Sequence, residues 1–288
     1  MSLLSHQYRS TTCPFFPKSE GGQGRKVARP LTHHSFLPII TIPKGDFLSK
    51  MVETTEVHQR VLLALRSWEG FDAFDPIFQE LQEVDIYLAG GALRDPLLGQ
   101  EHGTKDFDFF LGGKDEDIDR ALTRLAECGI MRTGPFGSPR WFSYSGKENY
   151  CDIIPIKRFF NGLWKCEDIV DVLNQFDFTS NAVALNLRSG QFYDPQNGLR
   201  DLLQRIMRAV RFDYPDEPIL HEQTITRPAV VWFRILHYAA TLNLAIEPIT
   251  RSWLERNKQF AEQGHAFSNT FFELHPRALA LAGCGQNA

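Results

Sequence analysis

The chain has 288 residues, of which 43% are hydrophobic and 23% are charged, and its formal net charge is −4. This is the composition of a globular protein, and it predicts one main domain with appendages. The net charge excludes a global basic field that would recruit nucleic acid, although a local basic cleft is compatible with it.

The cysteines and the hydropathy indicate the compartment. The five cysteines are scattered along the chain and lack the spacing of a zinc site or a disulfide framework. No segment reaches the ~20 apolar residues that a membrane-spanning helix needs, and the N-terminus lacks the apolar core of a signal peptide. We therefore expect a soluble, cytoplasmic protein with reduced thiols and no membrane partner.

Residues 1–50 are rich in Ser, Thr, Pro, Gly and Arg and show no sustained period. We expect a disordered extension there, and a chain that begins at Met51 should still fold. His33 and His34 have no Cys or acidic neighbours in this stretch, so we interpret them as solvated loop histidines rather than metal ligands.

The rest of the chain is expected to divide into a head, residues 51–213, and a short helical neck with a frayed end, residues 214–288. In the head, apolar residues at helical spacing predict two helices between residues 56 and 83. A loop near residues 69–75 should separate these helices.

Further along, the pattern changes between strand and helix. Strands are expected over residues 85–91, 104–113, 140–146, 149–160 and 180–194. Helical segments are expected over residues 92–99 and 115–129, and the strongest helix of the neck over residues 229–245. Because strands and helices mix without strict alternation, we predict the α+β class.

Two acidic residues in the second strand suggest a metal site. Asp106 and Asp108 lie two positions apart, so their side chains project from the same face of the strand. At ~4 Å, two like charges repel by about 4 kcal/mol at an effective dielectric of 20. The pair therefore favours a divalent cation, and oxygen ligands favour Mg²⁺ bound together with substrate phosphates.

Two glycines and an arginine precede this pair. Gly90 and Gly91 lack Cβ atoms, so the backbone can approach a ligand closely and its amides can cradle a triphosphate. Arg94 can give two hydrogen bonds to a phosphate, and Asp95 can hold that arginine in place. These residues together predict a site for a nucleoside triphosphate and its metal ions.

The string of residues resembles the head domain of the tRNA nucleotidyltransferase and bacterial poly(A) polymerase family. The family pattern is a strand, GGxVRD, LLG, a loop and DxD, and here it reads Gly90-Gly91-Ala92-Leu93-Arg94-Asp95, Leu97-Leu98-Gly99 and Asp106-Phe107-Asp108. A second block resembles the family's RRDFTINALA and DPxxGxxDL stretches at Asp177, Thr179, Asn181, Ala182, Asp194, Pro195, Gly198, Asp201 and Leu202. Two long motifs in the same order, over residues 84–211, make coincidence improbable.

The resemblance implies a polymerase-beta-like nucleotidyltransferase fold, with a small mixed sheet and helices. It implies two-metal transfer of a nucleoside monophosphate to a hydroxyl with loss of pyrophosphate, with Asp106 and Asp108 as metal ligands. Asp152 is the candidate third carboxylate, and an ordinary acidic residue at a strand edge is the alternative. We assign nucleotide binding to Gly90, Gly91, Arg94, Asp95, Asp177, Asn181 and Arg234.

The chain also departs from the family pattern. Gln175 and Phe176 stand where the family has paired arginines. The family's neck helix begins with an acidic pair and an arginine that select bases, whereas here Arg227 replaces an acid and only the later Arg234 remains. Because the acidic pair is missing, we expect loose base selection, and because this chain stops soon after the neck helices, we expect no ordered addition of cytidine and adenosine to tRNA.

Three functions stay open. The leading hypothesis is a metal-dependent nucleotidyltransferase whose acceptor is RNA, a protein hydroxyl or a small molecule. The alternatives are a minimal tRNA CCA-adding or poly(A) enzyme, and a non-catalytic nucleotide-binding regulatory module. The carboxylate pair argues against a decayed site, because nothing else favours keeping two repelling charges. Several aromatic side chains are expected in the core rather than stacked on bases, namely Trp141, Phe142, Phe159, Phe160 and Trp164.

Overall fold

The structure is a computed structural model that describes residues 58–68, 70–99, 107–134, 138–144, 150–159, 163–219 and 224–284. The chain divides into two compact units, residues 1–49 and 50–288, and every described residue lies in the second unit. The expected disordered extension therefore lies outside the described residues, as do Asp106 and Phe160.

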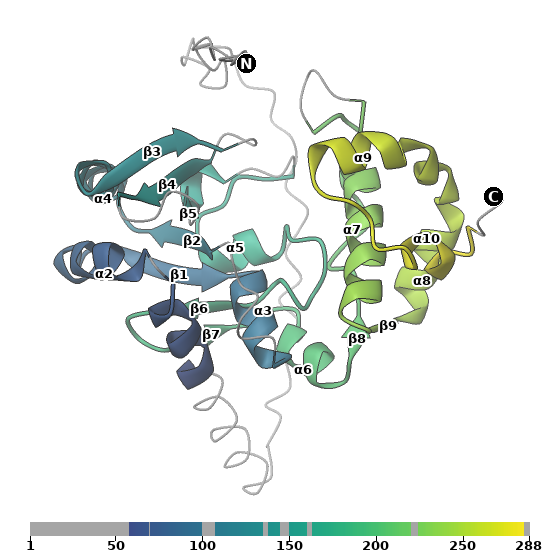
Figure 1. Cartoon of the computed structure of the whole chain (residues 1–288), viewed down its shortest axis with the longest axis horizontal. Coiled ribbons are helices and arrows are strands. Elements are labelled where there is room, and N and C mark those ends of the chain that lie inside the picture. The colour runs from purple at the N-terminus through teal and green to yellow at the C-terminus, as the bar shows by residue number, and fades with distance from the viewer. Residues whose placement is uncertain are drawn as a thin grey trace, which may run out of the picture. The chain divides into compact units, whose positions relative to one another are not determined.

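A seven-stranded mixed sheet forms the centre of the head (Figure 1), in the order β3-β4-β5-β2-β1-β6-β7. The pair β2–β5 is parallel and the other pairs are antiparallel. The strands are β1 (Asp85–Ala89), β2 (Phe107–Gly112), β3 (Gly129–Thr133), β4 (Pro139–Ser143), β5 (Tyr150–Pro155), β6 (Ala184–Asn186) and β7 (Phe192–Tyr193). A mixed sheet with helices is the α+β class predicted from the sequence.

One face of the sheet is covered by α2 (Phe71–Glu80), α4 (Asp115–Glu127) and a helix that includes residues 58–66. Alternate strand residues fill the core beneath them, including Leu88, Phe107, Phe109, Trp141 and Ile153. The second helix begins at Phe71, inside the stretch where we expect a loop. Phe74 packs on Phe109 with ring centroids 4.5 Å apart, so burial of this aromatic side chain extends the helix toward its N-terminus.

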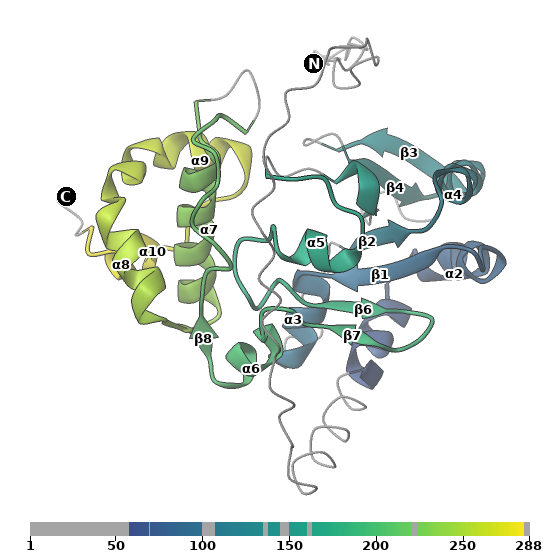
Figure 2. The ribbon, with the colours of Figure 1, turned by 180° about the vertical axis from the view of Figure 1, so that it is seen from behind.

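The opposite face is only partly covered. The short helix α5 (Ile169–Leu173) packs there against side chains of β1, β2 and β6, namely Tyr87, Ala89, Phe110 and Ala184. Figure 2 shows α5 beside β1 and β2 from behind. Over β4 and β5 the same face carries charged side chains instead, and these form part of the candidate site.

Three short elements connect the sheet to its surroundings. They are α3 (Gly91–Leu97), the 3₁₀ helix η1 (Ile156–Arg158) and α6 (Gly198–Leu203). The helical segment expected over residues 92–99 corresponds to α3, which ends before Gly99, a residue with φ of +75°. A positive φ suits glycine after a helix, because a side chain would be strained there.

The neck is a second helical cluster around α7 (Arg227–Thr241), with its own core that includes Trp232, Phe233 and Phe267. The helix is shorter than the expected 229–245, because Asn243 adopts a positive φ and the chain then pairs as a strand. The remaining elements are β8 (Ile206–Met207), β9 (Ala245–Ile246), α8 (Pro248–Arg256), η2 (Lys258–Gln263), α9 (Gly264–Thr270) and α10 (Ala278–Leu281).

The end of the neck differs from the expected frayed segment. Ala278 and Ala282 are buried in the neck core, and Arg277 donates a hydrogen bond to the carbonyl of Ala240 on α7. Small alanine side chains allow α10 to approach α7 closely, which the composition alone does not reveal. Among the described helices, none combines the length and apolarity needed to cross a membrane.

Candidate active site

Asp108 and Asp152 lie directly opposite each other on the parallel strands β2 and β5. Side chains that are opposite on neighbouring strands project from the same face of the sheet. The two carboxylates therefore lie side by side on the face of the sheet against which α5 packs. Asp106 precedes β2 and lies outside the described residues, so its role as a metal ligand stays a prediction.

Gly90 lies at the turn between β1 and α3, next to Asp108. Its φ is +75° and its ψ is −140°, and a Cβ added there would lie 3.5 Å from Oδ2 of Asp108. A glycine at this position avoids backbone strain and places no side chain beside Oδ2 of Asp108. At Gly91, an added Cβ would lie 3.4 Å from Nη2 of Arg94, so this glycine makes room for the arginine.

Arg94 is buried, with a side chain only 6% exposed, and its guanidinium contacts protein groups. Nε donates to Oδ1 of Asp95 at 2.8 Å, and Nη1 donates to Oδ1 of Asn181 at 2.7 Å. The guanidinium carbon also lies 4.6 Å from the ring centroid of Tyr238 on α7. A phosphate contact for Arg94, as predicted from the sequence, would require the guanidinium to change partners.

Asp177 and Asn181 continue these contacts to the neck. Oδ1 of Asp177 accepts from Nδ2 of Asn181 at 3.3 Å, and Oδ2 accepts from Nε of Arg234 at 2.6 Å. The guanidinium carbon of Arg234 lies 5.4 Å from the Tyr238 ring centroid. We call Arg94, Asn181, Asp177, Arg234 and Tyr238 the Arg94–Arg234 network. It joins most of the predicted nucleotide-binding side chains to one another, and nucleotide contacts for them stay predictions.

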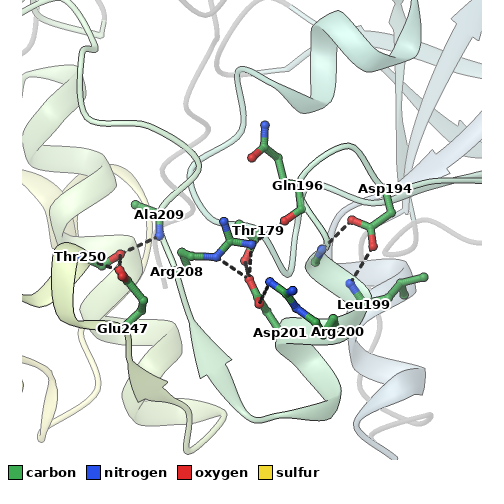
Figure 3. Close-up of polar contacts among 11 residues, drawn as sticks. Thr179, Asp194, Gln196, Leu199, Arg200, Asp201, Arg208, Ala209, Glu247 and Thr250 are labelled. Atoms are coloured by element: carbon green, nitrogen blue, oxygen red, sulfur yellow. Dashed lines mark hydrogen bonds and ion pairs between the residues drawn. The ribbon is translucent and has the colours of Figure 1, made fainter. Parts of the chain in front are cut away.

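The second half of the sequence motif surrounds the turn at Thr179 (Figure 3). Both carboxylate oxygens of Asp194 accept backbone N–H groups at the start of α6. An added Cβ at Gly198 would lie 1.9 Å from the carbonyl oxygen of Thr179, so only glycine allows α6 to lie against this turn. Asp201 is buried and accepts from Oγ1 of Thr179 at 2.7 Å and from Nε of Arg208 at 2.8 Å. These motif residues fix the turn that carries Asp177 and Asn181.

The same framework extends into the neck. Oγ1 of Thr250 on α8 accepts from the backbone N–H of Ala209 at 3.0 Å and donates to Glu247 (Figure 3). Thr250 is fully buried, so these hydrogen bonds satisfy its hydroxyl away from water.

The two positions where the family has arginines are part of the core here. Gln175 is buried and donates to the carbonyl of Trp164 at 2.8 Å. The ring of Phe176 lies 6.0 Å from that of Phe110 and 6.5 Å from that of Phe159. An arginine would not replace either side chain without disturbing this packing. The two positive charges of the family pattern are therefore absent at these positions, and Gln175 and Phe176 pack beside α5 instead.

Among the described aromatic side chains singled out in the sequence, Trp141 is buried, whereas Phe142, Phe159 and Trp164 are only partly buried. Trp141 is fully buried and donates to the carbonyl of Leu125 at 2.8 Å, as expected for a core residue. Phe159 packs against the cluster beneath α5, and the ring of Trp164 lies 4.4 Å from the guanidinium carbon of Arg211. Phe142 lies partly buried beside Tyr150, with ring centroids 5.4 Å apart.

Sequence reasoning missed two residues of the site, Arg140 and Tyr238. Arg140 on β4 binds both carboxylate oxygens of Asp152, at 2.8 and 3.0 Å. The pairing of β4 with β5 could not be read from the sequence, so nothing linked these two residues. Tyr238 lies four residues after Arg234 on a helix, and this spacing could have indicated their contact.

Cys151 precedes Asp152 on β5, and its side chain lies on the face of the sheet opposite the carboxylates of Asp108 and Asp152. It is fully buried in the core under α2 and α4. Burial raises the pKa of the Cys151 thiol well above its ordinary value, and the negative charges of Asp152 and Asp108 add to the effect. The thiol therefore stays protonated and takes no part in the chemistry of the site.

The donor set fits a divalent cation of the oxygen-binding type. The described residues contain no cluster of three or more His, Cys, Asp or Glu side chains. They do bring the carboxylates of Asp108 and Asp152 side by side, and Mg²⁺ needs only one or two carboxylates when substrate phosphates supply further oxygens. With the predicted Asp106, three carboxylates would be available.

The comparisons with known proteins agree with this geometry, although no family model matches the chain. The multifunctional CCA protein of Xanthomonas oryzae pv. oryzae is 30% identical over 209 residues, 69% of this chain and 46% of that protein. The CCA-adding enzyme of Lactobacillus delbrueckii subsp. bulgaricus is 27% identical over 203 residues, 68% of this chain and 47% of that enzyme. The Thermotoga maritima CCA-adding enzyme complexed with tRNA has a TM-score of 0.55 at 20% identity, covering 76% of this chain and 52% of that chain.

The fold is of the α+β class, with a mixed sheet and helices, and is consistent with a nucleotidyltransferase head. These similarities support membership of the tRNA nucleotidyltransferase family, whose members generally use divalent metal ions. It spans about half the length of the curated relatives that it matches.

Proposed function

We propose that the protein is a metal-dependent nucleotidyltransferase that transfers a nucleoside monophosphate from a nucleoside triphosphate to a hydroxyl of an RNA acceptor, with release of pyrophosphate. The observation that carries the proposal is the pairing of Asp108 with Asp152 beside the uncovered turn at Gly90. The names of the relatives favour RNA over a protein hydroxyl or a small molecule as the acceptor.

In this proposal Asp106 and Asp108 hold the metal, Mg²⁺ in the cell, and Asp152 is the third carboxylate. When bound, divalent cations would supply Lewis-acid activation of the hydroxyl and neutralise charge on the departing pyrophosphate. Gly90 leaves space for the triphosphate beside Asp108. The amides of Gly90 and Gly91 are the proposed phosphate donors.

The main role of the Arg94–Arg234 network would be to hold α7 in place beside the nucleotide site. It ties α7 to the head through the partly buried, charge-assisted hydrogen bond from Arg234 to Asp177, which is stronger than a neutral one. A fixed α7 would present one wall of the nucleotide site without needing to rearrange as the nucleotide binds. Asp95 and Asn181 serve this arrangement by holding Arg94.

A tRNA CCA-adding or poly(A) activity is the second candidate, because the relatives that cover most of this chain carry CCA-adding names. Two features disfavour ordered CCA addition. Gln175 and Phe176 replace the arginine pair, and the first turn of α7 contains no acidic residue. We therefore propose addition with loose base preference. We also propose a cytoplasmic location, because the described cysteines are all free thiols, as expected in a reducing compartment.

The test is incorporation of each labelled nucleoside triphosphate into total RNA, and into tRNA that lacks its 3′ end, in Mg²⁺. We expect incorporation that is lost in Asp108→Asn, with little change in melting temperature because this side chain is only partly buried. Efficient, ordered completion of the tRNA end would favour the CCA-adding candidate. Nucleotide binding without incorporation into any acceptor would favour the regulatory module and contradict the proposal.

A further inference from the structure

The outer strands β3 and β4 carry apolar side chains on the face of the sheet opposite the head core. The strand register places Ile130 on β3 opposite Phe142 on β4. Their sequence neighbours Met131 and Trp141 point the other way and pack in the core under α2 and α4. Ile130 is 41% exposed and Phe142 is half-buried, so Phe142 is not the core residue expected from the sequence.

The same face of the sheet leads to the candidate site. Arg140 lies two positions before Phe142 on β4 and opposite Asp152 on β5. Asp152 in turn lies opposite Asp108 on β2. Residues two apart on one strand, and residues opposite on neighbouring strands, project from one face. A ligand that lies along β4 from Phe142 toward Arg140 would therefore end beside the two carboxylates.

Tyr144 extends the apolar surface beyond the end of β4. It follows the strand directly, two positions after Phe142, and is 63% exposed. Neighbouring apolar side chains that stay exposed mark an interaction site more often than single scattered ones do. Aromatic rings on a sheet surface are a common platform for the bases of single-stranded nucleic acid, because every base has a flat face that can stack.

Arg132 gives this surface a positive charge. It lies on β3, two positions after Ile130, and is exposed. Its guanidinium carbon lies 5.0 Å from the ring centroid of Phe142, and stacking of this kind holds the planar group along the surface. A guanidinium in this position can pair with a backbone phosphate. Rings beside a positive charge fit the bases and phosphates of RNA better than the carboxylates of an acidic peptide.

We propose that Ile130, Arg132, Phe142 and Tyr144, the β3–β4 surface, bind the single-stranded 3′ segment of the RNA acceptor and direct its terminal hydroxyl toward the carboxylates. Bases stack on the two rings and pack on Ile130, and Arg132 pairs with a phosphate. The inference rests on the proposed function, because it names the surface on which the acceptor of that reaction lies.

The first measurement is the affinity for a fluorescently labelled oligoribonucleotide of about ten nucleotides, by fluorescence anisotropy over a series of salt concentrations. Tyr144→Ala should weaken binding about fivefold or more, because one stacked base loses its partner. Arg132→Gln should also weaken binding, and should reduce the slope of log Kd against log salt by about 0.7, because one phosphate contact is lost. Both changes are at exposed positions, so melting temperatures should stay near that of the wild type.

Two exposed residues away from this surface provide matched controls. Ile249→Ala on α8 removes an exposed apolar side chain, and Arg120→Gln on α4 removes an exposed charge. Both should bind the oligoribonucleotide as the wild type does.

Three results would overturn the inference. They are no measurable binding by the wild type, affinities of Tyr144→Ala and Arg132→Gln equal to those of the controls, and a duplex that binds as well as the single strand, because paired bases cannot stack on the rings. Sedimentation identifies a further alternative. If Tyr144→Ala dissociates a dimer and leaves RNA affinity unchanged, the surface joins two copies of the chain instead.

Transfer assays separate failure of this inference from failure of the proposed function. In Tyr144→Ala and Arg132→Gln, KM for the oligoribonucleotide should rise, whereas kcat and KM for the nucleoside triphosphate should stay near wild type. Asp108→Asn should lose transfer and keep RNA affinity. Normal transfer with an unchanged KM for RNA in both surface variants would refute the inference and leave the proposed function intact. RNA binding that depends on the β3–β4 surface, without transfer by the wild type, would support the surface and refute the proposed reaction.

Discussion

At the scale of single residues, the backbone turn at Gly90 lies next to the carboxylate of Asp108. The positive φ of Gly90 turns the chain from β1 into α3, and residue 90 places no side chain beside Oδ2 of Asp108. A substitution at Gly90 therefore has two separable consequences, strain in the turn and a methyl group beside the carboxylate.

Gly90→Ala should lower stability by about 1–2 kcal/mol through the left-handed backbone and should also weaken divalent-cation binding and transfer. Gly99→Ala is the matched control, because Gly99 has the same φ of +75° and no described atom lies within 4 Å of an added Cβ. The control should lose similar stability but keep cation affinity. Chemical denaturation and Mn²⁺ titration measure the two effects, and equal loss of cation affinity in both variants would contradict the role of Gly90.

His237 on α7 makes the neck sensitive to acid. Burial lowers the pKa of His237 to about 4, and the positive charges of His275, Arg234 and Arg94 add to the shift. The ring accepts a hydrogen bond from the backbone N–H of His275 at 3.0 Å and packs on Phe272, with ring centroids 4.4 Å apart. The neutral imidazole is therefore the form that fits the fold.

In an unfolded chain the pKa of histidine is about 6.5, so between about pH 6.5 and pH 4 the unfolded state binds the proton and the folded state does not. Stability should fall as the pH is lowered through this window. His237→Gln should show a smaller drop in melting temperature from pH 7 to pH 4.5 than wild type does. His265→Gln, at an exposed position, should behave like wild type, and a wild-type drop in His237→Gln would argue against this assignment.

At the scale of elements, α6 supports the turn that carries Asp177 and Asn181. The absence of a side chain at Gly198 allows the start of α6 to touch the carbonyl of Thr179, and Asp201 on α6 accepts a hydrogen bond from the Thr179 hydroxyl. The position of the Arg94–Arg234 network thus depends on how closely a short helix approaches a turn.

Gly198→Ala should destabilise the protein by about 1–3 kcal/mol or more, because backbone must move to admit the methyl group. It should also weaken nucleotide binding, since the turn shifts with α6. Gly264→Ala is the control: an added Cβ there meets only side-chain atoms of Phe233, at 3.7 Å, and should change stability by less than about 1 kcal/mol. Thermal melts and nucleotide titrations distinguish the variants, and a native-like Gly198→Ala would contradict the argument.

The sequence predicts elements and motifs where the information is local. The turn at Gly90, the neighbouring arginine and the strand before Asp108 follow from residue type and short spacing. The partners of Asp152 do not, because strand pairing places β5 beside β2 and β4 beside β5, although α4 and β3 separate β2 from these strands in the sequence. Arg94 is predicted as a phosphate ligand, although in the structure it donates hydrogen bonds to Asp95 and Asn181. Asn181 lies 87 residues further along the chain, so local spacing does not reveal this contact.

At the scale of the whole described unit, the head and the neck have separate cores, and the segment around Asp177 and Phe178 lies where they meet. Phe178 follows Asp177 in the head but is buried in the neck core, where its ring lies 5.3 Å from that of Tyr238. The carbonyl of Asp177 accepts the backbone N–H of Val210, and the hydroxyl of Tyr214 is hydrogen-bonded to the carbonyl of Gln175. The boundary expected at residue 213 therefore lies within a packed junction.

A chain truncated after Asp213 should not melt cooperatively, because Phe178 would be exposed and Asp177 would lose Arg234. Differential scanning calorimetry and binding of a hydrophobic dye, compared with the full chain, provide the measurements. A sharp transition with little dye binding would mean that the head is an independent folding unit after all.

The reactivity of the buried Cys151 thiol reports how often β5 separates from the sheet. Because the thiol lies on the strand that carries Asp152 and is both inaccessible and protonated, an alkylating reagent can reach it only when β5 separates from its neighbours. The rate of alkylation at this position, resolved by peptide mass spectrometry, therefore counts opening events of the strand. Ligands that bind across β2 and β5 should slow that rate in proportion to how strongly they hold the two strands together, even before any turnover is detected.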